Sequence, residues 1–153
     1  MSRRSKIVGR LIGPCFVDTS AFYALLDAED PHHKKSVGLF TQLGQSRVRL
    51  LTSNHVLFET YSLVLNRLGR RLAHAWLRTF AIHVERATAQ DEERAVQIVL
   101  RYRDKDFSLV DASSFALMER LSLRQAIAYD PHFRQYGRFV VLQQPVEQEE
   151  GHR

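Results

Sequence analysis

Cysteine and long apolar runs are both scarce in this chain of 153 residues. Its single cysteine, Cys15, excludes an internal disulfide and a cysteine-rich zinc site, and it suits a reducing compartment. No apolar run approaches the ~20 residues needed to cross a bilayer. The apolar stretch after the basic N-terminus is short and broken by Arg10, so it is not a signal peptide. We therefore expect a cytoplasmic protein with no membrane segment.

Several signatures of well-known chemistries are also missing. The sequence has no GxGxxG, P-loop or nucleophile-elbow motif. None of its seven histidines stands at the i, i+4 spacing of a helical zinc site, and we interpret His32, His33 and His132 as surface turn residues.

Size and composition indicate one globular domain with one core. The chain is 44% hydrophobic and 25% charged, and its net charge of +5 favours an anionic partner, of which nucleic acid is the commonest. We predict a basic arm at residues 1–14, a folded domain at 15–143 and a polar tail at 144–153. The arginines at 70, 71, 78, 101, 103 and 120 are interpreted as solvated helix faces, with a phosphate track as the alternative.

Strands and helices alternate along the chain. Strand patterns occur near residues 15–17, 48–52, 82–85, 125–128 and 139–142, and helical patterns near 20–26, 32–43, 54–68, 71–80, 89–102 and 108–121. We expect Val37, Phe40 and Leu43 on one face of the helix near 32–43, and the helix near 89–102 carries Ala95, Val96, Val99 and Leu100. This order predicts an α/β fold with a mostly parallel sheet covered on both faces.

Two acidic residues stand at predicted strand ends. Asp18 ends the first strand and Asp130 closes the strand before Pro131. The carboxyl edge of a parallel sheet is where ligands bind. As alternatives, Asp18 or Ser20 caps the following helix, and Asp-Pro is a common turn.

Two further acids lie on predicted helices. Glu59 falls within or beside an apolar stripe, where a buried carboxylate needs a cationic partner. As the alternative, Glu59 lies at the margin of the stripe and reaches solvent or pairs with a basic residue such as Arg67 or Arg101. Asp111 follows Ser108 in a capping-box pattern, yet a first helical turn beside the sheet edge also suits a metal ligand. Asp106 is a reserve ligand in an otherwise solvated loop.

These acids would converge at one edge of the sheet. Clustered carboxylates repel each other unless a cation neutralises them, and an all-oxygen ligand set suits Mg²⁺ or Mn²⁺ rather than zinc.

Four segments that carry these acids, at residues 17–21, 52–60, 108–118 and 129–133, resemble in order the acidic motifs of PIN domains, and in particular those of VapC-type toxins. The resemblance spans about residues 16–142. It implies a three-layer α/β/α sandwich and a Mg²⁺- or Mn²⁺-dependent ribonuclease that hydrolyses RNA phosphodiester bonds, the toxin of a type II toxin–antitoxin pair.

By the same resemblance, Asp18, Glu59 and Asp111 match the metal-binding acids and Asp130 matches a more variable fourth. Thr19, Ser20 and Asn54 match polar positions near the metal. The chain departs from the family at Ala128, where Thr or Ser is frequent.

The resemblance also implies an antitoxin protein partner and a homodimer. We expect the dimer interface to use Leu65, Leu68, Leu72, Trp76 and Leu77, unless these side chains complete the monomer core. The alternatives for function are a non-catalytic nucleic-acid- or partner-binding module and a stand-alone RNA-processing nuclease. A small-molecule phosphatase is disfavoured because Ser20 stands where aspartyl-phosphate chemistry would use a second Asp.

Overall fold

Five strands form the centre of the structure, a computed structural model that describes residues 13–146. They are β1 (Cys15–Val17), β2 (Leu50–Ser53), β3 (His83–Glu85), β4 (Gln125–Ile127) and β5 (Val140–Leu142). Their order across the sheet is β3-β2-β1-β4-β5, and every neighbouring pair is parallel. All five predicted strands are present. The predicted arm at 1–14 and tail at 144–153 fall mostly outside the described residues.

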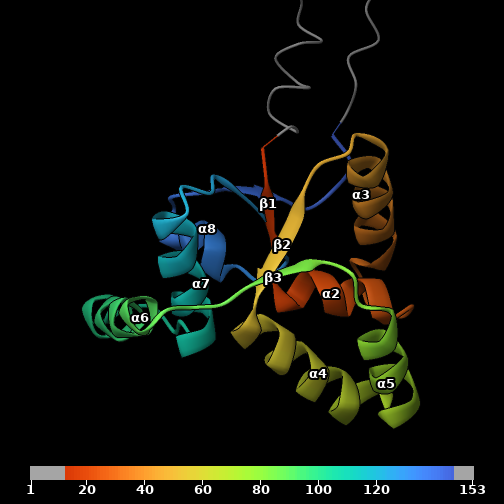
Figure 1. Ribbon diagram of the computed structural model, residues 1–153, viewed down its shortest axis with the longest axis horizontal. Helices are drawn as coiled ribbons and strands as arrows, with labels where there is room; N and C mark the ends of the chain where they lie inside the picture. Colours follow the sequence, from red (N-terminus) through yellow and green to blue (C-terminus); the bar gives the residue numbers. More distant parts are fainter. Residues whose placement is uncertain (1–12, 147–153) are drawn as a thin grey trace, which may run out of the picture.

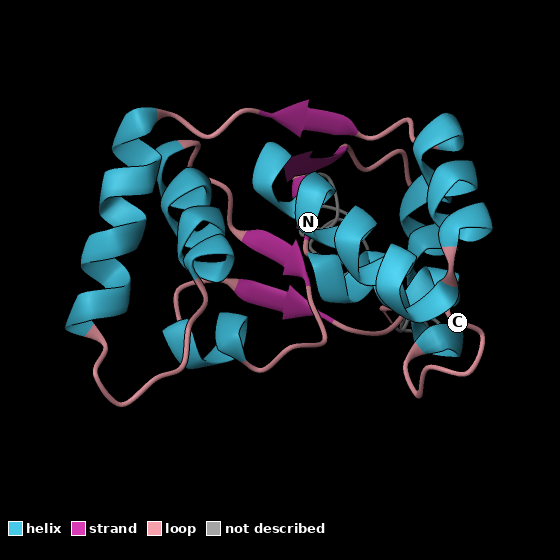
Figure 2. Cartoon of the chain, turned by 90° about the horizontal axis from the view of Figure 1, so that it is seen from below, coloured by secondary structure: helices cyan, strands magenta, loops and turns pink. Residues whose placement is uncertain are grey.

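Helices cover both faces of this sheet (Figures 1 and 2). One layer contains α2 (Thr19–Leu26), α3 (His33–Gln45), α4 (Asn54–Leu68) and α5 (Arg70–Thr79), and the other contains α6 (Ala89–Arg101), α7 (Leu109–Arg120) and α8 (His132–Tyr136). The predicted three-layer α/β/α sandwich with a parallel sheet is confirmed. Among the helices of residues 13–146, none combines the length and apolar character that a bilayer span requires.

The strand order places a topological switch point between β1 and β4. From β1 the chain proceeds outward to β2 and β3, then crosses back to β4 on the other side of β1 and continues to β5. The connections after β1 and after β4 therefore lie on opposite faces of the sheet. In open α/β sheets a crevice forms outside the carboxyl ends of the strands at such a point.

Helix α7 runs through the interior and carries one side of the core. Every residue from Asp111 to Met118 is buried. The Phe115 ring stacks on Tyr136 at 4.3 Å between centroids and meets Phe133 edge-on at 4.9 Å, which joins α7 to α8. A helix buried on all sides needs no amphipathic pattern, and its burial fixes Asp111 relative to the sheet.

The predicted apolar face of α3 is partly wrong. Val37 is 42% exposed, and the face packed on the domain consists of Ser36, Leu39 and Leu43. Ser36 can occupy a buried position because its hydroxyl donates a hydrogen bond to the Ala21 carbonyl at 3.3 Å.

The buried face of α6 includes a carboxylate. Val96 and Leu100 are 47% and 70% exposed, whereas Asp91 and Ala95 are buried. Asp91 is accommodated because Arg120 of α7 donates hydrogen bonds of 2.9 to 3.1 Å to its carboxylate. Arg120 therefore links two helices and is not part of a free phosphate track.

Candidate active site

Asp18 lies where β1 ends and α2 begins. Its backbone N–H donates to the Ile127 carbonyl of β4 at 3.0 Å, and its Oδ2 accepts hydrogen bonds from the N–H and the hydroxyl of Ser20 at 3.2 and 2.6 Å. The Ser20 hydroxyl in turn accepts the Tyr129 N–H at 2.9 Å. Asp18 is thus both the cap of α2 and a residue of the sheet edge, so the two interpretations of the sequence are compatible.

Glu59 projects from α4 beside the buried stripe of that helix. Its Oε2 accepts a hydrogen bond from the Thr19 hydroxyl at 2.9 Å, and the fully buried Thr60 donates to Thr19 Oγ1 at 3.2 Å. A chain of hydroxyls, rather than Arg67 or Arg101, therefore orients this carboxylate. Thr60 was not identified from the sequence, although it directly follows Glu59.

Asp111 closes a capping box at the start of α7. Its N–H donates to Ser108 Oγ at 3.0 Å, and its Oδ2 accepts the Ser108 N–H at 3.1 Å. The same Oδ2 lies 2.6 Å from Nδ1 of His132. As with Asp18, the capping role and the position in the site coexist.

Asp130 follows β4 and is held by His132. Its Oδ1 accepts the His132 N–H at 2.9 Å and lies 2.9 Å from the Nδ1 of the same residue. The prediction that His132 is a surface turn residue is wrong, because its side chain is only 22% exposed and contacts two of the acids. It begins α8, a short helix absent from our predictions. Pro131 was a possible signal, since proline is common at helix starts.

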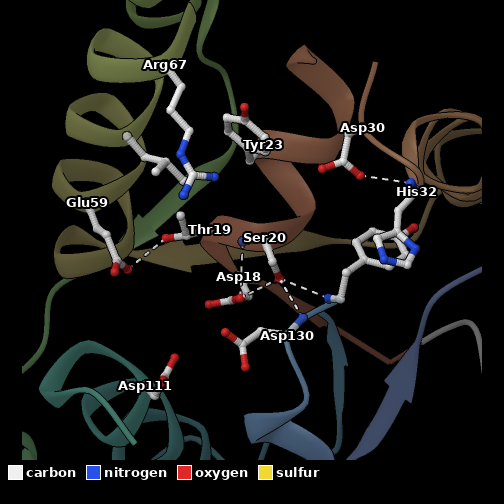
Figure 3. Close-up of a pocket in the computed structure, with 12 residues that line it drawn as sticks. Asp18, Thr19, Ser20, Tyr23, Asp30, His32, Glu59, Arg67, Asp111 and Asp130 are labelled. Atoms are coloured by element: carbon white, nitrogen blue, oxygen red, sulfur yellow. Dashed lines mark hydrogen bonds between the residues drawn. The ribbon is translucent and has the colours of Figure 1, made fainter. Parts of the chain in front are cut away.

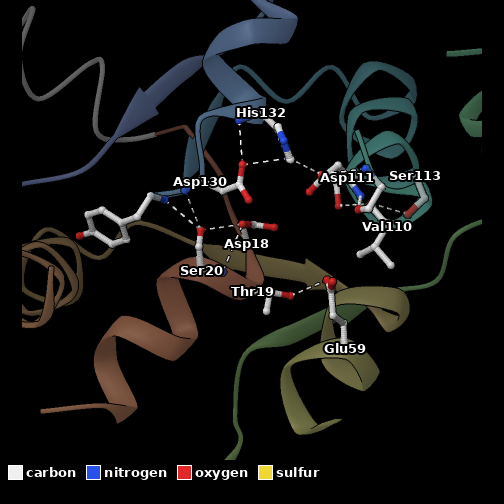
Figure 4. A network of polar contacts seen from close by, with 12 residues as sticks. Asp18, Thr19, Ser20, Glu59, Val110, Asp111, Ser113, Asp130 and His132 are labelled. Carbon is white, nitrogen blue, oxygen red and sulfur yellow. Dashed lines mark hydrogen bonds and ion pairs between the residues drawn. The ribbon is translucent and has the colours of Figure 1, made fainter. Parts of the chain in front are cut away.

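The four carboxylates surround one hollow of about 350 Å³ at the switch point. Figure 4 shows Asp18, Glu59, Asp111 and Asp130 arranged around a common space, and Figure 3 shows the wall beyond them. The other lining residues are Thr19, Ser20, Tyr23, Asp30, His32, Leu63, Arg67 and Tyr129. The convergence of two strand ends and two helices that we predicted is therefore present.

Burial and mutual repulsion disfavour the charged forms of these acids. Burial raises the pKa of Asp18 to about 7, and the negative charges of Asp111 and Glu59 contribute to this rise. The pKa of Glu59 and that of Asp111 also lie above their usual values, first because of burial and then because of neighbouring carboxylates. Clusters of this kind are stabilised by a cation.

The donor set fits a hard divalent cation. Carboxylate oxygens are the ligands that such ions prefer, and Mg²⁺ usually keeps several waters. Within residues 13–146, no three acidic, histidine or cysteine side chains stand close enough to form a ready-made metal site. Binding would thus require the carboxylates to turn inward or to reach the ion through water.

Two predicted site residues lie elsewhere. Asn54 does not line the hollow, because its Oδ1 accepts the Ala87 N–H at 2.8 Å and ties the loop before α6 to the start of α4. Asp106, the reserve ligand, is exposed and is likewise absent from the lining.

Comparison with known protein families identifies the family to which this chain belongs. The PIN domain model matches residues 15–139, which include all four acids. The chain belongs to the PIN domain family. The resemblance drawn from the four motifs is thereby confirmed, and PIN-domain nucleases of the VapC type are generally dependent on divalent metal ions.

Named relatives of this PIN domain are nucleases. The chain is 39% identical over 126 residues to the 23S rRNA-specific endonuclease VapC20 of Mycobacterium tuberculosis, covering 80% of this chain and 93% of that protein. It is 30% identical over 135 residues to Ribonuclease VapC26 of the same organism, covering 82% and 98%. The crystal structure of VapC20, described as a sarcin–ricin loop cleaving toxin, superposes with a TM-score of 0.74 at 37% identity, covering 86% of this chain and 99% of that one.

Proposed function

We propose that this PIN domain is a Mg²⁺- or Mn²⁺-dependent endoribonuclease and the toxin of a type II toxin–antitoxin pair. The observation that carries the proposal is the convergence of Asp18, Glu59, Asp111 and Asp130 on one hollow at the switch point of the sheet. The names of the VapC relatives support it, because they describe an endonuclease, a ribonuclease and a sarcin–ricin loop cleaving toxin.

In this proposal the four acids hold the metal and their neighbours position them. When bound, a divalent cation supplies positive charge to the scissile phosphate and activates a water for in-line attack. The Thr19 hydroxyl orients the Glu59 carboxylate. Ser20 links Asp18 to the turn after β4. His132 contacts both Asp111 and Asp130.

The substrate we propose is ribosomal RNA, specifically the sarcin–ricin loop of 23S rRNA. The support is the 39% identity to a 23S rRNA-specific endonuclease and the structural match to a sarcin–ricin loop cleaving toxin. We further propose that the protein acts in the cytoplasm, where this RNA resides.

Cleavage of a defined RNA tests this function. Purified protein is incubated with a sarcin–ricin loop hairpin, with the same sequence as DNA and with total RNA, in Mg²⁺, Mn²⁺ or EDTA, and the new ends are mapped by sequencing. We expect cuts at one position of the hairpin, none in DNA and none in EDTA. Cleavage of other RNAs only would reject the 23S rRNA assignment, and no cleavage of any RNA would favour the non-catalytic alternative.

The proposed partners are an antitoxin that blocks the hollow and a second copy of this chain. Trp76 is buried in the core, as the monomer alternative required, whereas Leu65 and Leu77 are 36% and 43% exposed and remain available for a dimer. Light scattering tests the dimer, and a monomer at micromolar concentration would reject it. Co-expression with the adjacent reading frame tests the antitoxin, and failure to co-purify or to relieve toxicity would favour a stand-alone RNA-processing nuclease.

A further inference from the structure

The hollow extends beyond the four acids along a wall that phosphodiester hydrolysis itself does not use. This wall contains Tyr23 at the middle of α2, Asp30 and His32 in the turn before α3, and Arg67 of α4 (Figure 3). Tyr129, after β4, also belongs to it. Two of these are tyrosines and one is an imidazole, so the wall offers flat ring surfaces beside a carboxylate cluster.

The His32 and Tyr129 rings are stacked face to face. Their centroids lie 4.6 Å apart and their planes are 13° from parallel. The Tyr129 N–H donates to Ser20 Oγ at 2.9 Å, and the Ser20 hydroxyl donates to Asp18 Oδ2 at 2.6 Å. Two hydrogen bonds thus tie the Tyr129 backbone, from which one ring of the stack projects, to Asp18.

The His32 side chain is not required by the helix that it precedes. It is the N-cap residue of α3 but forms no side-chain capping bond. Its backbone N–H is instead satisfied by Asp30 Oδ1 at 2.8 Å. The imidazole is therefore available to bind a ligand, and the Asp30 carboxylate beside it is a hydrogen-bond acceptor.

Arg67 supplies the complementary charge. Of the described residues that line the hollow, it alone carries a fixed positive charge. Its guanidinium lies over the Tyr23 ring, 5.4 Å from the centroid, and Tyr23 is itself anchored by donating to Asp27 at 2.7 Å. A backbone phosphate next to the acids would meet this guanidinium.

We propose that this wall is a nucleobase subsite for the nucleotide beside the scissile phosphate, an inference that rests on the proposed RNA cleavage. The base stacks on His32, which Tyr129 supports from behind, and Asp30 accepts a hydrogen bond from an amino or imino N–H on the base edge. Arg67 binds the neighbouring phosphate. Only an unpaired nucleotide can present its face and edge in this way, so the subsite selects single-stranded or looped RNA.

The test compares binding of normal and abasic RNA. In the Asp18→Asn background, which prevents turnover, dissociation constants are measured by fluorescence anisotropy for a short RNA carrying an abasic site at each position around the cleavage point. With His32 present, we expect one abasic position to weaken binding roughly 5- to 150-fold, the range for loss of one base–aromatic stack. With His32→Ala added, normal and abasic RNA should bind equally, and His32→Phe should restore the difference.

Matched measurements separate this inference from the proposed function. His83→Ala, which alters a histidine remote from the hollow, should leave the abasic difference unchanged, and Asp30→Asn should weaken binding of the normal RNA. An equal abasic effect with and without the His32 ring, or no binding of either RNA, would overturn the subsite. Cleavage by the wild-type protein is scored separately, so a nuclease without this subsite is distinguished from a protein that is no nuclease.

Discussion

Nδ1 of His132 lies 2.6 Å from Oδ2 of Asp111 and 2.9 Å from Oδ1 of Asp130. One imidazole thus connects the first turn of α7 to the turn after β4, two elements that belong to different parts of the chain (Figure 4). A donor shared by two carboxylates orients both and offsets their repulsion.

Replacing His132 by alanine should therefore reduce RNA cleavage. Groups that orient metal ligands typically account for 10- to 100-fold in affinity or activity, and we expect a loss of about that size. Initial rates at saturating Mg²⁺ would measure it, with His83→Ala as the control. A wild-type rate for His132→Ala would show that Asp111 and Asp130 need no such support.

Thr19→Val should also reduce cleavage, because it removes the hydroxyl that orients Glu59 while nearly preserving shape. A hydrogen bond to a charged group contributes about 1.5–3 kcal/mol, so a loss of about tenfold or more is expected. Thr19→Ser retains the hydroxyl and should keep most of the activity. Equal rates for the Val and Ser variants would contradict this role.

Asp18→Asn should stabilise the metal-free protein at neutral pH. The pKa of Asp18 rises from 3.8 to about 7 on folding, so its ionised form costs stability. That cost is absent below pH 3.8, grows between pH 3.8 and about 7, and is complete above. Asparagine also retains the capping function at the start of α2.

Thermal unfolding in EDTA measures this effect. The variant should melt above the wild type at pH 8, by ~2–4 °C for each kcal/mol, and the difference should shrink toward pH 4. A variant that melts lower than the wild type at pH 8 would show that the contacts of the ionised Asp18 carboxylate stabilise the fold more than its burial and repulsion destabilise it.

The sequence predicted Asp18, Asp111 and Asp130 because each stands at a recognisable boundary between elements, whereas Glu59 was found from its position beside an apolar helical stripe. Asp18 ends an apolar run, and Asp111 lies three residues after Ser108. The same positions also suit helix caps, and single-residue reasoning could not separate the two roles. The structure explains why: the first turn of a helix at the sheet edge needs a cap and faces the ligand site at once.

Long-range side-chain contacts could not be read from the sequence. The bonds from His132 to Asp111 and from Thr60 to Thr19 join residues 21 and 41 positions apart. The face of α3 was misjudged because Ser36 is buried there through its hydrogen bond to the Ala21 carbonyl. Asp91 of α6 is likewise buried through a tertiary partner, Arg120. Prediction from periodicity assumes that the buried positions of a helix are apolar, so a polar residue that is buried through a partner breaks the pattern.

Arg120→Ala should destabilise the fold without touching the acids of the hollow. Burial raises the pKa of Asp91, but hydrogen bonds from Arg120 and Thr88 outweigh burial and bring the pKa below its usual value. This stabilisation is present above pH ~4 and is lost as the pH falls through the folded pKa.

At pH 7, leaving Asp91 without its partner should cost about 1.5–3 kcal/mol, measured by urea unfolding. Arg101→Ala, at an exposed position of α6, should change stability by less than about 0.5 kcal/mol. Equal stability of the two variants would show that the pair contributes little.

Calorimetric titration of Mn²⁺ tests most directly whether the four acids form a metal site. The wild-type protein should bind Mn²⁺, Asp18→Asn and Asp111→Asn should lose most of that binding, and Asp104→Asn, whose side chain is 79% exposed, should bind as the wild type does. Binding of equal strength by the wild type, Asp18→Asn and Asp111→Asn, or no binding by the wild type, would contradict the account.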